Sequence, residues 1–282
     1  MKSNTHAKQV ERFAETAQNY ITRLTNILAE PDTEVRQAFD SFLAKLRNDL
    51  NNTTTEGDAI EMLAQHIIML PVFKVLFEEY QFIRENPVSR AIQRVLDALK
   101  KANFEQESKD LEKFYDSVKL RACGLTDPQE KQKLILEIYE KFFRYAFPLT
   151  AQKLGIVYTP IEVVDFIIHS VNEVLQTEFG KTLGSPGVKI MDSFTGTGTF
   201  ITRLLQSGLI KKEEMEYKFR HEIYANEIVP LAYYIAGINI EATYHSIMSG
   251  DYVPFEDIYL TDTFQLYEQG KDQMSDLHEA KQ

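Results

Sequence analysis

The chain has 282 residues, 44% of them apolar and 26% charged, which are the proportions of a soluble globular protein with one large domain or two ordinary ones. Its formal net charge is −11, and no apolar run approaches the roughly 20 residues that a membrane-spanning helix requires. The single cysteine, Cys123, excludes an intrachain disulfide, and we expect it to be a small buried side chain in a reducing cytoplasm.

The charge is unevenly distributed along the chain. Residues 1–150 carry 21 basic and 23 acidic side chains, whereas residues 151–282 carry 10 and 19. An acidic surface does not by itself grip a phosphate backbone. Any basic surface for nucleic acid must therefore lie outside the second part.

The first part of the chain has the apolar spacing of helices. Helices are predicted within 7–50, over 59–82 with an interruption at Pro71, and over about 105–122 and 128–146. Another helix restarts at Pro87, and its apolar face consists of Ala91, Val95 and Leu99. Few β-branched alternations occur before residue 150, so this part is predicted to be all-α.

The pattern changes near residue 150. In "GIVYTPIEVVDFIIHSVNEVL", Thr159 is predicted to cap a helix, Pro160 to take its first position and Glu162 to complete a capping box. Strands are then predicted at 187–192, 222–227 and 257–264, with helices at 199–208 and 231–244 between them. Strands that alternate with helices indicate a parallel sheet.

The loop "DSFTGTGTF", at the end of the first strand, predicts a ligand crevice. A phosphate-binding loop of the G-x-x-x-x-G-K type is excluded, because Ile201 stands in the sixth place and no lysine follows. A dinucleotide loop fits Gly196 and Gly198, but Ile201 also stands where that loop needs a small residue. The dinucleotide alternative is thereby weakened and stays open.

A third ligand, S-adenosyl-L-methionine, suits the acids at the strand ends. Asp192 ends the first strand and suits the cationic methionine end, and the glycines leave room for the backbone beside the ligand. The helix that follows offers free N–H groups to the carboxylate. Glu227 ends the second strand, where it can accept both ribose hydroxyls, and Asp262 can accept from the adenine amino group.

Four segments together resemble the amino-methylating DNA adenine methyltransferases, and more narrowly that of single-chain type ISP restriction–modification enzymes. They are "GIVYTPIEVVDFI", "DSFTGTGTF", "YANEIVPLAYYIAGINIE" and "LTDTFQ", and the likeness covers about residues 60–267. It implies a helical coupler over residues 1–150, followed over 151–282 by the cofactor-binding part of a Rossmann-like methyltransferase sheet. The expected fold is thus α/β, an all-α domain followed by a partial sheet.

The resemblance also implies the cofactor-binding residues. They are Tyr158, Thr159, Pro160, Asp192, Phe194, Gly196, Gly198, Glu227, Ile228, Asp262 and Phe264. Asp251 competes with Asp262 for the adenine contact, and Asp262 is preferred because a strand precedes it. No metal site is expected, because the six histidines show no ligand spacing.

One departure bears on activity. Such enzymes need an Asn/Asp-Pro-Pro-Tyr/Phe motif to hold the flipped adenine. The only Asn-Pro here, Asn86-Pro87, is followed by Val88, and Pro-Pro is absent. We therefore expect no catalytic residue in this chain, which would be a fragment truncated before that motif and inactive alone.

The implied partners are double-stranded DNA, bound through regions of a parent protein outside this chain, and motor and nuclease regions of the same polypeptide. No membrane is implied, and the location is cytoplasmic. Methyl transfer to amino groups of protein or RNA would share much of the motif set. The alternative of another class is a helical coupling module with a vestigial nucleotide-binding fold.

Overall fold

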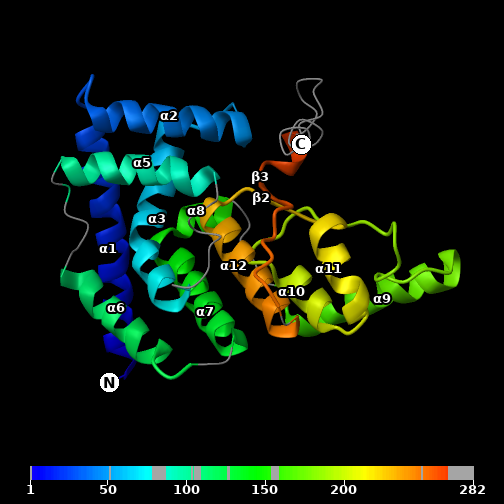
Figure 1. Ribbon diagram of the computed structural model, residues 1–282. Helices are drawn as coiled ribbons and strands as arrows, with labels where there is room; N and C mark the ends of the chain where they lie inside the picture. The colour runs from blue at the N-terminus through cyan, green and yellow to red at the C-terminus, as the bar shows by residue number, and fades with distance from the viewer. Residues whose placement is uncertain are drawn as a thin grey trace. The chain divides into compact units, whose positions relative to one another are not determined.

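The computed structural model describes residues 2–50, 52–77, 87–102, 104, 109–125, 128–153, 159–248 and 250–265 (Figure 1). They fall into two compact units. The helical unit comprises Met1–Lys45 and Thr55–Tyr158, and the sheet unit comprises Leu46–Thr54 and Thr159–Gln282. The predicted fold class, a helical domain followed by a partial parallel sheet, is confirmed.

The helical unit is built around α1. Its described helices are α1 (Lys2–Leu28), α2 (Glu34–Asp49), α3 (Glu56–Phe77), α5 (Pro87–Lys101), α6 (Lys109–Ala122), α7 (Pro128–Ala146) and α8 (Pro148–Lys153). Helix α1 packs against α3, α6 and α7, and α3 also packs against α6. Leu24, Phe39 and Leu63 are buried from three different helices, so the apolar faces share a core.

Arg36 fastens the first three helices together. Its guanidinium makes two hydrogen bonds to the Glu56 carboxylate, at 2.7 and 3.2 Å, and one to the carbonyl oxygen of Leu28 at 3.2 Å. Asp40, one turn along α2, pairs with the same guanidinium at 2.9 Å. Arg36 thus joins the last turn of α1 to the first turn of α3, a geometry that the planar guanidinium suits.

Two predictions for the helical unit were wrong. Helix α3 continues through Pro71, because burial of its apolar side chains, including Met69 and Val72, outweighs one lost backbone hydrogen bond. Cys123 is exposed near the end of α6 instead of buried. In contrast, α5 begins at Pro87 as predicted.

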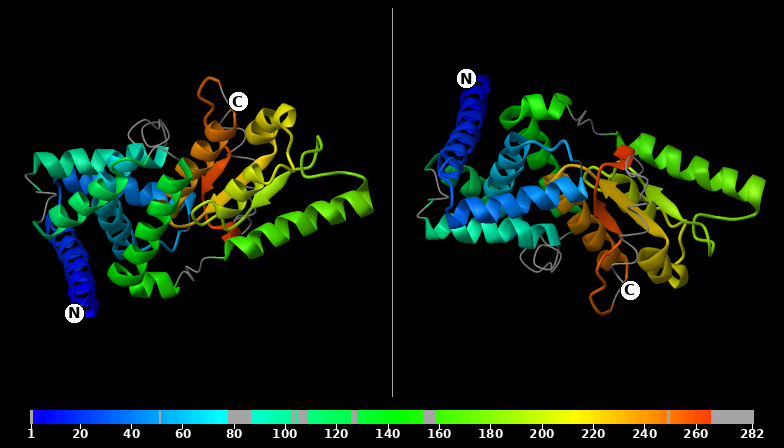
Figure 2. Two further views of the ribbon diagram at one scale, coloured as in Figure 1. Left: turned by 90° about the horizontal axis from the view of Figure 1, so that it is seen from below. Right: turned by 90° about the horizontal axis from the view of Figure 1, so that it is seen from above.

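The sheet unit alternates helices with short parallel strands. Its elements are α9 (Ile161–Phe179), β1 (Ile190–Asp192), α10 (Thr199–Gln206), α11 (Lys212–His221), β2 (Ile223–Glu227), α12 (Pro230–Ile247), β3 (Ile258–Leu260) and a 3₁₀ turn at Thr263–Gln265. The strands lie side by side in the order β1-β2-β3 (Figure 2). Asp192 is paired with Ala225, and Glu227 with Leu260.

Some local predictions for this unit were also wrong. Pro160, not Thr159, stands at the cap of α9, and no side chain caps the helix. The carbonyl of Pro160 accepts from the amides of Val163 and Val164 in the first turn. Helix α11 was not among the predicted helices, and the strands are shorter than predicted.

Helix α9 is held to α10 by a bidentate ion pair between Arg203 and Asp165, at 2.8 and 2.7 Å. These hydrogen bonds lower the pKa of Asp165. Elsewhere α9 carries exposed apolar side chains, among them Phe166 and Val174. Ile167 and Val171 are exposed as well, whereas Val164 and Ile168 are buried, so the apolar side chains of α9 are only partly covered.

A buried ion pair joins α11 to the segment that precedes β1. The Lys218 side chain is 0% exposed. Its ammonium donates to the carbonyl oxygens of Ser185 and Val188, at 2.7 and 2.6 Å. The same ammonium pairs with the Glu222 carboxylate at 2.5 Å. Glu222 also accepts from the Gly187 amide at 2.7 Å. Burial alone would raise the pKa of Glu222, but these bonds outweigh it and the net pKa is lowered.

Replacing Lys218 with alanine should lower the free energy of unfolding by about 3–5 kcal/mol, because Glu222 would keep its buried charge without a partner. Urea unfolding followed by circular dichroism measures this loss. The double variant Lys218→Met with Glu222→Leu should recover most of it, since no charge then remains buried. A single variant as stable as the wild type would contradict the structural role of the pair.

Candidate functional site

The carboxylate of Glu227 joins the loop after β1 to the end of β2. Its Oε2 accepts the backbone N–H of Gly196 and its Oε1 that of Val229, both at 2.7 Å. The loop is also tied to β2 by Thr195, whose amide donates to the carbonyl of Asn226 at 3.0 Å. The glycine loop therefore bends back over the carboxyl end of β2, and this places Glu227 beside it.

Glu227 is buried in this position. Burial raises its pKa to about 7, against the lowering effect of hydrogen bonds from the amides of Val229, Gly196 and Ile228, and the nearby charge of Asp192 raises it further. Each carboxylate oxygen has a second lone pair. A carboxylate offers about four such sites in all, and the amides of Val229, Gly196 and Ile228 use three, so Glu227 can accept about one more hydrogen bond from a ligand.

Asp192 has an unsatisfied oxygen at the end of β1. Its Oδ1 accepts the Phe194 amide at 3.3 Å, while its Oδ2 is buried and has no hydrogen-bond partner among the described residues. Burial raises the pKa of Asp192 to about 6, partly opposed by the bond from Phe194. A buried carboxylate oxygen without a partner is a rare and costly feature, and a ligand donor or cation would satisfy it.

The segment after β3 closes against the same loop. Thr263 donates from its hydroxyl to the carbonyl of Ser193 at 2.7 Å, and the rings of Phe194 and Phe264 lie 5.4 Å apart. The exposed fractions of these two rings are 65% and 82%. Asp262 fixes the turn, because its Oδ1 accepts the Phe264 amide at 3.0 Å. Two exposed aromatic rings therefore stand beside the acids.

Asp251 lies at the opposite edge of the sheet. It is exposed and follows α12, the helix that returns the chain from the carboxyl end of β2 to the start of β3. Asp262 instead follows β3 and shares its edge with Asp192 and Glu227. The topology therefore favours Asp262 over Asp251 for any contact with a ligand of these acids.

The two glycines serve different purposes. Gly196 has a φ of +56°, and a Cβ there would meet nothing within 4 Å, so this side of the loop is open. Gly198 has a φ of +86°, and its Cβ would lie 3.2 Å from Ala236 and Ile240 on α12. The absence of a side chain at Gly198 thus lets α10 approach α12, whereas the sequence suggested that it clears space for a ligand.

Not every candidate joins the cluster. Tyr158 lies outside the described residues. Thr159 and Pro160 are exposed before α9, and in the part of the chain that the structure describes no hydrogen bond connects them to the acids. Ile228 is partly exposed and donates its amide to Glu227.

Sequence reasoning missed four polar residues that hold the site. Thr195 donates from its hydroxyl to the carbonyl of Asp192 at 2.9 Å, and Asn239 on α12 donates to the carbonyl of Thr197 at 2.9 Å. The Asn226 amide reaches the Thr263 hydroxyl at 3.4 Å. Asn226 and Asn239 are buried polar residues in mostly apolar elements, and that is the signal that could have identified them.

These features fit a sulfonium nucleoside. The site consists of two carboxylates that accept hydrogen bonds, one of them with an unsatisfied oxygen, a glycine loop open on one side, and two exposed rings. A parallel strand–helix–strand unit with this loop defines the class: a partial methyltransferase fold of Rossmann-like type.

The comparisons with known proteins agree with this class. A family model for the coupler domain of Type ISP restriction–modification enzymes matches residues 4–130, and one for N-6 DNA methylases matches residues 130–277. The chain belongs to the N-6 DNA methylase family, in the arrangement found in Type ISP restriction–modification enzymes. The resemblance read from the sequence is thereby confirmed. A search of curated proteins gave no match.

Three solved structures are similar over nearly the whole chain. The Type ISP enzyme LlaBIII bound to DNA is 46% identical, with a TM-score of 0.80 over 92% of this chain. A nuclease-deletion mutant of LlaGI with a DNA substrate mimic is 43% identical, with a TM-score of 0.80 over 96%. The DrdV–DNA complex is 32% identical, with a TM-score of 0.79 over 93%. The chain spans only 18%, 22% and 26% of those proteins.

Within the described residues, no three His, Cys, Asp or Glu side chains are grouped to hold a metal ion. No described helix combines the length and apolar character needed to cross a bilayer.

The Asp192→Asn variant should be more stable than the wild type at pH 8, by about 1–3 kcal/mol. The raised pKa of Asp192 means that the folded chain binds this proton more tightly than the unfolded chain does. The carboxyl group thus favours folding at low pH, and this contribution is lost as the pH rises from about 4 through about 6. Urea unfolding at pH 5 and pH 8 tests this, with the exposed Asp251→Asn as control; a variant less stable at pH 8 would contradict it.

Gly198→Ala should lower the free energy of unfolding by about 1–3 kcal/mol from its left-handed φ, with a further loss from contact with α12. Gly196→Ala is the matched control, because it carries the conformational strain without the contact. Thermal unfolding should therefore rank wild type above Gly196→Ala, and Gly196→Ala above Gly198→Ala. Equal losses would mean that α12 does not press on this turn.

Proposed function

We propose that this chain is the S-adenosyl-L-methionine-binding part of a DNA adenine-N6 methyltransferase in a restriction–modification system. Residues 1–150 are proposed as the coupler and residues 151–282 as the cofactor-binding part of the methyltransferase. The observation that carries the proposal is the meeting of Asp192 and Glu227 beside the glycine loop, with one Asp192 oxygen left unsatisfied.

The bound cofactor would supply a methyl group activated by its sulfonium. Glu227 would accept from the ribose hydroxyls with its remaining lone pair, and Asp192 would compensate positive charge at the methionine end. Phe194, Ile228 and Phe264 would contact the adenine, with Asp262 as acceptor of its amino group. Residues Tyr158, Thr159, Pro160, Gly196 and Gly198 complete the proposed set.

Catalysis is a separate matter from cofactor binding. The sequence contains no Pro-Pro, so the side chain and carbonyl that would accept hydrogen bonds from a target adenine are not supplied by these 282 residues. We propose that this chain binds the cofactor and transfers no methyl group by itself. A preparation that methylates DNA alone would contradict this part of the proposal.

The proposed setting is cytoplasmic, in a larger polypeptide. The similar enzymes are four to five times longer than this chain, and each was solved with DNA. Double-stranded DNA and the motor and nuclease regions of one polypeptide are accordingly the proposed partners. The alternative, a coupling module with a vestigial sheet, predicts a folded chain without cofactor affinity.

Calorimetric titration with S-adenosyl-L-methionine and with its demethylated product tests cofactor binding. Glu227→Ala should weaken binding by about 1–3 kcal/mol, because the ribose hydroxyls would be left unpaired. Asp251→Ala is the matched control and should bind normally. If circular dichroism shows that the wild-type chain is folded and the titration nevertheless detects no heat of binding, the coupling-module alternative is favoured.

Cofactor affinity should also increase as the pH rises from 6 to 8. Hydroxyl donors favour the ionised form of Glu227, and its pKa of about 7 means that binding at low pH must first expel a proton. The dissociation constant should therefore rise by up to about tenfold per pH unit below 7. Titrations in buffers of different ionisation enthalpy would detect the released proton. A dissociation constant that does not change between pH 6 and pH 8 would contradict the proposed role of Glu227.

A further inference from the structure

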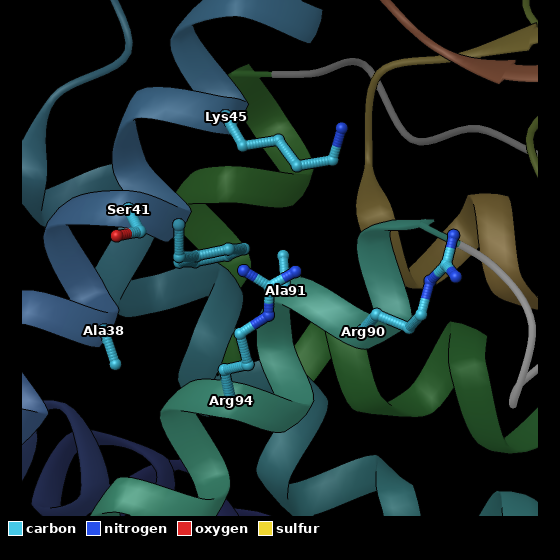
Figure 3. Close-up of a pocket in the computed structure, with 7 residues that line it drawn as sticks. Ala38, Ser41, Lys45, Arg90, Ala91 and Arg94 are labelled. Carbon is cyan, nitrogen blue, oxygen red and sulfur yellow. The ribbon is translucent and has the colours of Figure 1, made fainter.

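A groove in the helical unit lies between α2 and α5, away from the acids described above in sequence and in chemistry. It has a volume of about 340 Å³ and is lined by Ala38, Ser41, Phe42, Lys45, Arg90, Ala91 and Arg94. Figure 3 shows Ser41 and Lys45 on α2 and Arg90 and Arg94 on α5, with Arg94 directed toward α2. The helices run side by side, and Lys101 at the end of α5 pairs with Glu34 at the start of α2 (Figure 1).

The charged side chains that line the groove are all basic. Helix α5 carries four basic residues, Arg90, Arg94, Lys100 and Lys101, and one acid, Asp97. In a chain with a net charge of −11, the excess of basic residues on α5 is a local reversal of charge.

The nearby acids are engaged elsewhere. Glu34 pairs with Lys101, Asp40 pairs with Arg36, and Asp97 accepts from the Gln93 amide at 2.8 Å. Arg90 and Arg94 are exposed, and no ion pair to either of them occurs in the described part of the chain. Their guanidinium groups are therefore available to an anion from outside the helical unit.

The side chains that line the groove indicate which kind of anion it can bind. Phe42 is buried, so its ring offers no stacking face, and Ala38 and Ala91 are small. No acidic side chain lines the groove to accept from the amino groups of a base. Arginine forks suit the paired oxygens of a phosphate, and Ser41 adds a hydroxyl donor. The groove thus suits phosphate groups and gives no means of reading bases.

We propose that the α2–α5 groove binds the phosphate backbone of duplex DNA without regard to sequence. This goes beyond cofactor binding, because it gives the helical unit a DNA contact of its own. The similar enzymes were solved with DNA, and the acidic sheet part of this chain is unsuited to such a contact. Arg90 and Arg94, one helical turn apart on α5, bind the backbone from one side of the groove.

Fluorescence anisotropy of a random-sequence DNA duplex, titrated with the full 282-residue chain at several salt concentrations, tests the proposal. The wild type should bind, with log affinity falling linearly with log salt. The Arg90→Gln/Arg94→Gln variant should bind roughly tenfold more weakly and lose about two from that slope, since each phosphate contact contributes about 0.9. Changing the sequence of the duplex should not alter the result.

Lys100→Gln is the matched control, because Lys100 is an exposed cation on the same helix outside the groove. It should retain nearly all of the affinity. Failure of the wild type to bind, an unchanged slope in the double variant, or an equal loss in Lys100→Gln would each overturn the proposal.

Competition experiments distinguish DNA from other anionic ligands. Inorganic phosphate should compete only at concentrations far above those of the duplex, whereas competition by polyglutamate as effective as that of DNA would indicate an acidic protein partner and overturn the assignment. Calorimetry of the double variant with S-adenosyl-L-methionine should match the wild type. Loss of DNA affinity and failure of the cofactor proposal are thus distinguishable.

Discussion

The contact between the Glu227 carboxylate and the backbone amide of Gly196 organises the sheet unit. This single 2.7 Å hydrogen bond crosses from the loop after β1 to the end of β2 and makes two segments more than thirty residues apart into one surface. Thr263, bonded to the carbonyl of Ser193, adds the third strand end. Strand pairing sets Asp192 and Glu227 on neighbouring strands, and these bonds hold the loop that carries Phe194 and the turn that carries Phe264 beside them.

That arrangement opposes stability. Two carboxyl groups in one partly closed region each have a raised pKa, which means that neutral pH forces charge into surroundings that resist it. Lys218 and Glu222 show the contrasting solution in the same unit, because there each buried charge has a partner. Asp192 differs from that pair, because one of its oxygens is buried without a partner among the described residues. Such exceptions occur most often where a ligand binds.

The two units have local charges of opposite sign at their candidate binding surfaces. The sheet unit concentrates negative charge where a cationic cofactor would lie, and the groove on α2 and α5 presents the exposed guanidinium groups of Arg90 and Arg94. The net charge of −11 for the whole chain does not show this difference, because it is the sum over both surfaces. Local charge, and not the total, therefore indicates what each unit can bind.

The sequence by itself determined most of the elements and their class, although α11 was not among them, because apolar periodicity, prolines such as Pro87 and acids at strand ends are local signals. It did not determine that α3 passes through Pro71, that Gly198 faces α12, or that Thr263, Asn226 and Asn239 support the site. Each of these depends on a partner distant in sequence, whose packing or hydrogen bond outweighs local preference. Only the tertiary structure decided which oxygen of Asp192 is left unsatisfied and which arginines face a common groove, because both follow from what the folded chain places beside them.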